Sequence, residues 1–571
     1  MPTLEGDFDD LVTLFGRPLQ PEEMDHILDA VKGEWKHFDP ETRRFKIELN
    51  DTNRPDLWSV EGIARQLRGG SALPGRPYDF LEKAEKRRAG AGAPDIRVDS
   101  SVLPVRPVLG GFVARGGRLG EEGLAQLIGT QERLSELFGR KRSDLAIGVY
   151  PFKRITFPLT FRTSDPSSTR FVPLGHDESL SLREIVDSHP KGIAYGGLVS
   201  SHPSWPVLVD DRGEILSFPP IVNGRSTGEV MPEDESLFVE ATGYDSSRIL
   251  LVLNILAANL ADRGYRIDPL LVSGEVDLVA PADIGTVVSV PAGLPAEILG
   301  IESDPRDFVE TLLSYGYTQI SRYEAEGKGD WKVLSPFYRD DLLGAVDVVE
   351  DYLMARGYDS FDPIMPSSFT KGRSSSRQKI ELRLRQAMMG MGYVELLSNI
   401  LTGESQVASR LGRSGEGLVC IDNPASLQFA VVRPTLLSGL LSAESRSSRF
   451  PYPHRVFEVG EAMVLEENIE GGKERRVRDR WLLAAILSHP TASVSELQGV
   501  LEFLFERMDR SLAIKSVELS PFLPGRSGVY VNSQGVQVAC IGEIHPKFLD
   551  IWGIRMPSVC FEVDVEFLLA P

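Results

Sequence analysis

The chain has 571 residues, too many for one hydrophobic core, and at roughly 150 residues per domain it is expected to form three to five domains. Hydrophobic residues make up 42% and charged residues 25%, as in ordinary soluble globular proteins. The net charge of −20 argues against a stand-alone nucleic-acid binder, because such proteins draw affinity from lysine and arginine that neutralise phosphates. A local basic face, or a partner chain that makes most of an RNA contact, is compatible with this charge.

Signals for a membrane or for secretion are missing from the sequence. No run of about 18 apolar residues occurs, and the amino terminus, MPTLEGDFDD, lacks the basic-then-apolar pattern of a secretory signal. Cys420, Cys540 and Cys560 lie far apart without a CxxC pair, which argues against a zinc site or a disulfide framework. We therefore expect a soluble cytoplasmic protein with no membrane contact.

The first domain is expected over residues 1–94. Ser59 should cap a helix with apolar residues at helical spacing, and Gly69 should end that helix. The stretch Lys83–Pro94, KAEKRRAGAGAP, has a charged start and a tail of glycine and alanine. We interpret this stretch as an exposed linker.

The next segment, residues 95–271, mixes strand and helix signals and predicts an α+β domain. Its strand-like runs are Leu145–Tyr150, Pro206–Val209 and Glu214–Phe218. The last two runs flank the turn residues Asp-Asp-Arg-Gly, which indicates a hairpin. The segment closes with a long apolar helix for which Ser246 or Ser247 is the expected N-cap and Gly264 the stop.

Two further segments follow. Residues 272–362 contain two amphipathic helical patterns, each ending in Gly-Tyr, and predict a small helical domain. Residues 363–571 open with a helix at Ser376–Gly392, with Ile380, Leu384, Met388 and Met391 on one stripe. This segment ends in alternating or apolar runs that predict strands of one antiparallel sheet.

Four stretches, in this order and with these spacings, resemble the beta subunits of phenylalanyl-tRNA synthetase of the archaeal/eukaryotic type. They are NDTNRPDLWSVEGIAR (Asn50–Arg65), Arg170–Val222 followed by Asn223, YRDDLLGAVDVVED (Tyr338–Asp351), and FEVGEAMV (Phe457–Val464) with CIGEIHPKFLDIWGI (Cys540–Ile554). The chain has no room for the additional barrel and anticodon-binding domains of the longer bacterial type.

The resemblance implies an α+β multidomain fold with four parts. These are an amino-terminal domain with a linker (1–94), an editing α/β domain (95–271), a small helical, winged-helix-like domain that binds Mg²⁺ (272–362), and a class II synthetase-like antiparallel-sheet module (363–571).

An acidic cluster lies in the third part. Asp347, Glu350 and Asp351 have i, i+3, i+4 spacing and share one helix face, whereas Asp341 can join them only from the first turn or before it. Spacing alone leaves two readings open: a capping aspartate with a solvated acidic face, or a set of oxygen ligands for a hard cation. The resemblance implies that Asp341, Asp347, Glu350 and Asp351 bind Mg²⁺.

The resemblance also implies an editing pocket formed by Leu208, Ser217, Asn223 and Glu240. A pocket that selects phenylalanine by apolar contact cannot strongly reject tyrosine, so a second site has to recognise the phenol and hydrolyse the mischarged ester. Asn223 and Glu240 have suitable chemistry for a phenol, an amine or a water. Without the resemblance, the four residues read as a hairpin core residue, a strand polar residue, a turn residue and a surface charge.

One departure from the family pattern bears on this pocket. Residues Ile147–Lys153 read IGVYPFK where the family commonly has IGIHDLD, so the His-Asp pair is missing. A scaffold subunit with a decayed editing site is therefore one alternative function. A stand-alone hydrolase of mischarged aminoacyl-tRNA is another.

The carboxyl-terminal module lacks the expected signals for ATP. Arg455 precedes VFEVGE, but no Gly-rich element with a second arginine follows, and GRSGVYV (Gly525–Val531) reads as a turn into a strand. The module is thus expected to be catalytically silent, with no catalytic residue for aminoacylation. The resemblance implies an alpha subunit that binds ATP and phenylalanine, an α₂β₂ complex, and tRNA(Phe) as substrate.

Overall fold

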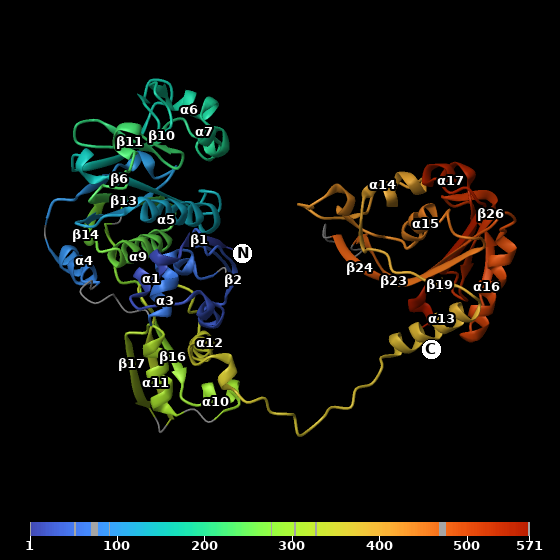
Figure 1. Cartoon of the computed structure of the whole chain (residues 1–571). Helices are drawn as coiled ribbons and strands as arrows, with labels where there is room; N and C mark the ends of the chain where they lie inside the picture. Colours follow the sequence, from blue (N-terminus) through green and yellow to red (C-terminus); the bar gives the residue numbers. More distant parts are fainter. Residues whose placement is uncertain are drawn as a thin grey trace. The chain divides into compact units, whose positions relative to one another are not determined.

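The computed structural model describes residues 2–50, 53–69, 78–90, 92–275, 277–301, 304–325, 328–467 and 475–568. The chain divides into two compact units, Met1–Ile364 and Met365–Pro571 (Figure 1). Each unit combines helices with several sheets, which confirms a mixed α+β multidomain fold. Across the described ranges, no helix is long and apolar enough to cross a membrane.

The amino-terminal part of the first unit has a three-stranded antiparallel sheet of order β1-β3-β2, covered by short helices. Its elements are β1 (Thr3–Asp7), α1 (Phe8–Phe15), α2 (Met24–Ile27), β2 (Gly33–Phe38), β3 (Arg44–Leu49) and α3 (Val60–Leu67). Helix α3 starts as predicted, because the Ser59 hydroxyl accepts a hydrogen bond from the Gly62 N–H at 3.0 Å. Asp51 and Thr52 of the NDTNRPD stretch lie outside the described residues.

Helix α4 (Phe80–Ala89) replaces most of the predicted linker, and the prediction was wrong there. Phe80 and Ala84 are buried, and the Phe80 ring makes edge contacts with Phe337 at 5.5 Å between centroids. The helix packs on strand β14 (Arg266–Ser273). The prediction from composition missed these two apolar residues, one turn apart, because charged residues surround them in the sequence.

A ten-stranded sheet forms the centre of the first unit, with the order β12-β11-β10-β7-β4-β14-β5-β13-β6 and β15 paired to β14. Its strands are β4 (Ile96–Val98), β5 (Val108–Arg115), β6 (Leu145–Pro151), β7 (Leu159–Ser164), β10 (Trp205–Val209), β11 (Ile215–Phe218), β12 (Val222–Asn223), β13 (Ser236–Gly243), β14 and β15 (Leu278–Ala280). The predicted hairpin is confirmed, since β10 pairs antiparallel with β11. The two ends of the strand order meet, because the Asn223 side-chain N–H donates to the Val149 carbonyl of β6 at 3.4 Å.

Helices cover this sheet, and a small two-stranded sheet lies beside it. They are α5 (Gly120–Arg133), α6 (Leu182–Ser188), α7 (Pro190–Tyr195), α8 (Arg225–Gly228) and α9 (Ser246–Asp262), with strands β8 (Arg170–Phe171) and β9 (Leu180–Ser181). Helix α9 is almost wholly buried between the sheet and α3 (Figure 1). Its cap is Asp245, which accepts from the Ser247 N–H, and not Ser246 or Ser247 as predicted.

The segment after residue 271 is not purely helical, so that prediction was wrong. Strand β14 runs across residue 271, and an antiparallel sheet of order β16-β18-β17 packs on three helices. The elements are β16 (Val287–Pro291), α10 (Leu294–Leu299), α11 (Pro305–Ser314), β17 (Gln319–Ala325), β18 (Lys328–Leu334) and α12 (Ala345–Arg356). Trp331 and Val333 alternate into the core against Phe308, while the charged Asp330 and Lys332 on either side of Trp331 obscured the strand pattern.

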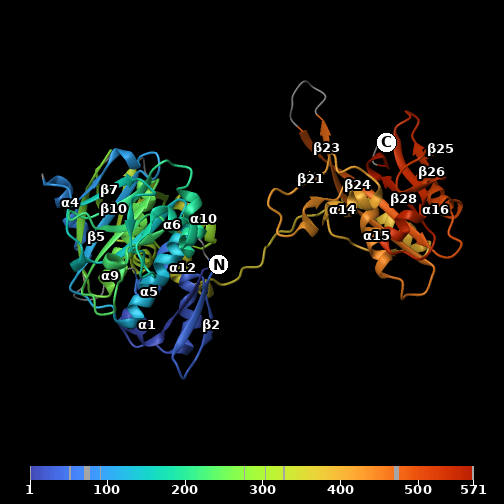
Figure 2. The ribbon, with the colours of Figure 1, turned by 90° about the horizontal axis from the view of Figure 1, so that it is seen from above.

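The second unit is built on a seven-stranded sheet of order β19-β23-β24-β28-β27-β26-β25 (Figures 1 and 2). Its larger elements are α13 (Ser376–Gly390), α15 (Leu437–Arg446), β23 (His454–Glu467), β24 (Arg475–Ser488), α16 (Val494–Arg507), β25 (Ala513–Ser516), β26 (Phe522–Val531), β27 (Gln537–Ile544), α17 (Pro546–Trp552) and β28 (Ser558–Asp564). Shorter pieces are β19 (Val394–Glu395), β20 (Leu401–Thr402), α14 (Glu404–Val407), β21 (Val419–Cys420) and β22 (Val431–Val432).

Alternation along β24 gives this unit two cores. Leu483 and Ala485 face α13 and α16, whereas Leu482 and Ala484 face α15 and α17. The predicted stripe of α13 packs into the first core through Leu384 and Met388, with Ile380 and Met391 at its edge. The predicted antiparallel strands near the carboxyl end are confirmed as β26, β27 and β28.

We expect Phe80→Ala to lower the free energy of unfolding by about 3–5 kcal/mol, because it empties a buried aromatic site. Glu82→Ala, whose side chain is 81% exposed on the same helix, is the control and should change stability by less than about 0.5 kcal/mol. Chemical denaturation followed by circular dichroism measures both values. Equal, small effects would mean that α4 is not anchored.

Candidate functional site

The four carboxylates of the acidic cluster do not share one position. Asp341 lies in the loop before α12, three residues ahead of the N-cap Gly344, so it does not cap the helix. The Asp347 carboxylate accepts the backbone N–H groups of Leu343 and Gly344, both at 2.7 Å. This aspartate therefore provides the cap, a task suited to a negative charge in a first helical turn.

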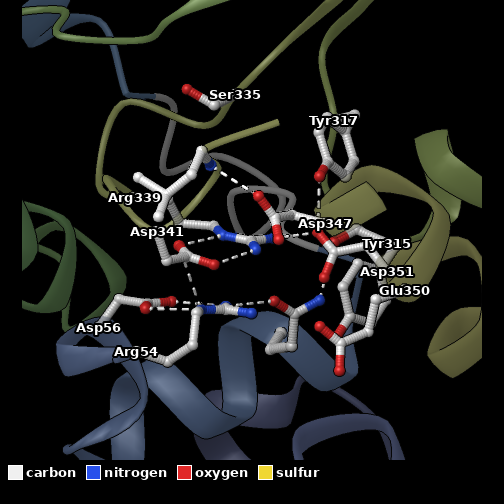
Figure 3. A network of polar contacts seen from close by, with 12 residues as sticks. Arg54, Asp56, Tyr315, Tyr317, Ser335, Arg339, Asp341, Asp347, Glu350 and Asp351 are labelled. Carbon is white, nitrogen blue, oxygen red and sulfur yellow. Dashed lines mark hydrogen bonds and ion pairs between the residues drawn. The ribbon is translucent and has the colours of Figure 1, made fainter. Parts of the chain in front are cut away.

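Protein cations neutralise the other three carboxylates. Arg339 donates to both oxygens of Asp341, at 2.9 and 2.6 Å, and to Asp351 at 2.6 Å (Figure 3). The Tyr317 hydroxyl also donates to Asp351 at 2.5 Å. Glu350 is half exposed and pairs with Lys32 at 2.7 Å. Burial alone would raise the pKa of Asp341, but the hydrogen bonds from Arg339 outweigh it and lower that pKa.

The cluster extends to the amino-terminal part through Arg54. This buried guanidinium holds Asp56 with two hydrogen bonds, at 2.8 and 2.7 Å, and lies 3.9 Å from Asp341 (Figure 3). Within the described residues, no three acidic, histidine or cysteine side chains are arranged to hold a metal ion. Because Arg339 occupies the space between Asp341 and Asp351, the arrangement in this chain does not fit Mg²⁺.

A second candidate site is a cavity of about 230 Å³ at the place where β12 approaches β6. Three predicted residues line it: Ser217 from β11, Asn223 from β12 and Glu240 from β13. Leu208 does not line this cavity. It pairs with Ser217 across the hairpin and lies fully buried in the core behind it.

Most of the cavity wall is apolar, and the polar groups gather at Glu240. The apolar part comes from Leu124, Leu127, Ile128, Ala146, Ile147, Val149, Leu174, Phe218, Pro219, Pro220, Ile221, Val222 and Val230. Glu240 Oε2 is buried and has no hydrogen-bond partner among the described residues, while the buried Ser217 hydroxyl lies beside that of Tyr150. Burial raises the pKa of Glu240 to about 7, although a hydrogen bond from Tyr150 and the charge of Arg106 lower it.

The sequence reasoning missed the charged residues of the cavity, in which Glu132 and Glu229 accompany two basic side chains. Arg142 and Lys191 both line it, and Arg142 donates to the carbonyls of Pro220 and Ile221 at 3.1 and 3.0 Å. Residues Arg140–Arg142 are three successive non-glycine residues with positive φ, and only Gly139 separates them from a π-helical turn at Leu134–Phe138. Such backbone is rare and concentrates at functional sites. The only sequence signal was the basic tripeptide itself.

A cavity with a largely apolar wall and a buried, unpartnered carboxylate oxygen can hold a small apolar group that carries a hydroxyl or an amine. Two family models match the chain elsewhere. The "tRNA synthetase B5 domain" matches residues 288–358, and the "Phenylalanyl tRNA synthetase beta chain CLM domain" matches residues 362–565.

Full-length relatives carry the comparison further. The chain is 34% identical to the phenylalanine–tRNA ligase beta subunit of Thermococcus onnurineus over 99% of this chain and 98% of the relative. It is 33% identical to that of Pyrococcus abyssi over 100% of both chains, and 33% identical to that of Borrelia garinii over 96% of both. The chain belongs to the family of phenylalanine–tRNA ligase beta subunits, which confirms the resemblance seen in its sequence.

A solved structure agrees with this assignment. The amino-terminal fragment of the phenylalanyl-tRNA synthetase beta subunit from Pyrococcus horikoshii matches with a TM-score of 0.56 and 31% identity. The matched region covers 62% of this chain and 100% of the fragment. The archaeal likeness therefore holds in structure as well as in sequence.

Arg339→Met should lower the free energy of unfolding by about 3–5 kcal/mol, because it leaves Asp341 and Asp351 buried without their cation. Arg356→Met removes a partly exposed ion pair to Asp307 and should cost less than about 1 kcal/mol. Urea denaturation at neutral pH compares the two variants. A small loss for Arg339→Met would show that the network does not depend on its guanidinium.

Removal of divalent metal should leave the melting temperature of the isolated chain unchanged, since Arg339, Lys32 and backbone N–H groups already satisfy the four carboxylates. Thermal unfolding in EDTA, in Mg²⁺ and in a monovalent salt of equal ionic strength tests this. Stabilisation by Mg²⁺ alone, abolished by Asp351→Asn, would establish a metal site in this chain.

Proposed function

We propose that this chain is the structural and editing subunit of a phenylalanine–tRNA ligase, which it forms with a separate alpha subunit as an α₂β₂ complex in the cytoplasm. The complex joins L-phenylalanine to tRNA(Phe) with conversion of ATP to AMP and diphosphate. Membership of the beta-subunit family supports the ligase role. The three cysteines are free thiols, as a reducing compartment favours.

The aminoacylation site belongs to the alpha subunit in this proposal. A fully buried arginine of the second unit, Arg433, is held by Glu458 at 2.6 Å and by the Glu461 carbonyl at 2.8 Å. Its donors are thus engaged by contacts within the protein. This supports a class II synthetase-like but catalytically silent module in residues 363–571, with ATP and phenylalanine bound by the partner.

The boundaries and roles of the other domains are part of the same proposal. They are an amino-terminal domain in 1–94, an editing domain in 95–271 and a winged-helix-like domain in 272–362. A Mg²⁺ site at Asp341, Asp347, Glu350 and Asp351 would require the contacts of Arg339 and Lys32 to open. No step of the proposed ester hydrolysis depends on this metal site.

Editing is the function that the cavity supports. The observation that carries it is the buried, unpartnered Glu240 Oε2, which lines a cavity with a largely apolar wall together with the Ser217 hydroxyl. A tyrosine side chain fills apolar space and brings a hydroxyl that these atoms can bind, whereas phenylalanine would leave the carboxylate oxygen buried and unpaired. Such a site rejects the analogue without the hydroxyl by a large factor.

The chemistry is hydrolysis of the ester between the mischarged amino acid and the terminal ribose of the tRNA. Water adds to the carbonyl carbon, the bond to the ribose oxygen breaks, and the proton of the water passes to that oxygen. Arg142 and Lys191 provide positive charge beside the cavity for the anionic tRNA end. The pocket acts by positioning ester and water, with no covalent enzyme intermediate.

In the complex of this chain with its alpha subunit, Glu240→Ala and Asn223→Ala should slow hydrolysis of tyrosyl-tRNA(Phe) by about 10–100-fold, because each removes a buried polar contact. Phenylalanylation should stay unchanged. Glu214→Ala, an exposed carboxylate at the hairpin end, is the matched control.

The same assays separate the alternatives. Full hydrolysis by the lone chain, with no effect of this chain on phenylalanylation, would indicate a stand-alone deacylase. Phenylalanylation with no hydrolysis in the complex would indicate a scaffold. Hydrolysis unaffected by either substitution would exclude these pocket residues.

A further inference from the structure

A tyrosine stands at the position where the sequence departs from its family, and its hydroxyl reaches the polar end of the cavity. The Tyr150 O–H lies 3.0 Å from Glu240 Oε1 and 3.3 Å from Asn223 Oδ1. Both partners line the cavity, whereas Tyr150 itself lies in the core behind it. One buried hydroxyl thus lies beside two of the proposed pocket residues, and its single proton points to the nearer acceptor, Glu240.

Strand register explains why this contact forms. Strands β6 and β13 are antiparallel, with Tyr150 opposite Phe238 and Gly148 opposite Glu240. Residues two apart on a strand share a face, so Tyr150 and Glu240 are diagonal neighbours across Gly148. A Cβ at Gly148 would lie 2.3 Å from Glu240 Oε1 and 2.4 Å from the Tyr150 hydroxyl oxygen. Only glycine leaves room for the bond.

The tyrosine ring is fixed as well. It stacks on Phe238 with a centroid distance of 5.6 Å, and Phe238 meets Phe157 edge-on at 5.5 Å. Tyr150 is fully buried, so its hydroxyl has little freedom to leave the carboxylate. Because Oε1 is engaged, Oε2 is the Glu240 oxygen without a partner.

We propose that Tyr150 is a positioning residue of the editing pocket: its O–H donates to one oxygen of Glu240, and so presents the other Glu240 oxygen to the hydroxyl of a mischarged aromatic side chain. This inference rests on the proposed editing function. It gives the YPFK departure a role, because the tyrosine supplies a fixed donor at the polar end of the cavity.

The bond also couples Tyr150 to the charge on Glu240. The titratable and charged groups around this carboxylate are Tyr150 on β6, Arg106 ahead of β5, and the cavity residues Glu132, Arg142, Lys191 and Glu229. The hydrogen bond from Tyr150 favours the ionised carboxylate and lowers its pKa. Loss of the hydroxyl should therefore raise the pKa of Glu240 above its present value of about 7.

The test is the pH profile of tyrosyl-tRNA(Phe) hydrolysis by the complex with its alpha subunit. Wild-type kcat/KM should rise with pH around 7 as Glu240 ionises. In Tyr150→Phe it should be roughly tenfold lower at pH 7, with its midpoint moved to higher pH, and should recover to within about threefold at high pH. Tyr265→Phe, which removes a buried hydroxyl bonded to the Asp234 carbonyl at 3.0 Å, is the control and should leave the profile unchanged.

A double substitution separates positioning from mere packing. If Tyr150 acts through Glu240, Tyr150→Phe should have no further effect in a Glu240→Gln background. An equal loss at every pH, or full additivity with Glu240→Gln, would overturn the inference while wild-type hydrolysis still upheld editing. Absence of hydrolysis in the wild-type complex would instead refute the proposed function.

Discussion

Buried charge has to be neutralised by charge, and one alternating series of carboxylates and guanidinium groups does this in the first unit. Asp56, Arg54, Asp341, Arg339 and Asp351 follow one another in space, and all five side chains are at least nine-tenths buried. Desolvating these groups costs several kcal/mol per ion, so the series is stable only when complete. It fixes the loop before α12 against the segment that leads into α3.

This constraint changes the interpretation of the acidic cluster. The spacing in the sequence placed three carboxylates of α12 on one helix face, but it did not decide whether that face meets solvent or binds a metal ion. The structure separates them: Asp347 caps the helix, Glu350 meets Lys32 at the surface, and Asp351 is buried beside Tyr317. A shared helix face does not make a shared site, because side chains of that length reach different partners. The cation that lies among these carboxylates is Arg339, two residues before Asp341.

Local signals were sufficient for most features that the chain organises locally. The Ser59 cap of α3, the β10–β11 hairpin and the alternating strands of the second unit were all predictable from spacing and turn chemistry, whereas the cap of α9 was placed one or two residues too late. The larger errors depended on distant partners. Helix α4 is held by Phe337, and the strands around Trp331 needed helices α11 and α12 to define their buried face.

The pocket shows the same division. The resemblance brought together Ser217, Asn223 and Glu240, but placed Leu208 at the cavity when its side chain lies in the core behind. From the sequence, Tyr150 suggested a weakened editing site, because the missing His-Asp pair is visible there. The contact that replaces the pair becomes visible only once β6 and β13 are paired in register. Likewise, the basic tripeptide Arg140–Arg142 gains meaning only from the rare backbone that turns Arg142 to the cavity.

Positions 148 and 150 constrain each other sterically as well as chemically, and this limits how the site can evolve. Any side chain at Gly148 would collide with the tyrosine hydroxyl and with Glu240, so a change there is tolerated only after the bulky ring or the carboxylate has gone. The order of substitutions therefore matters, and the two positions are epistatic. A lineage that acquires tyrosine at position 150 must then keep glycine at position 148.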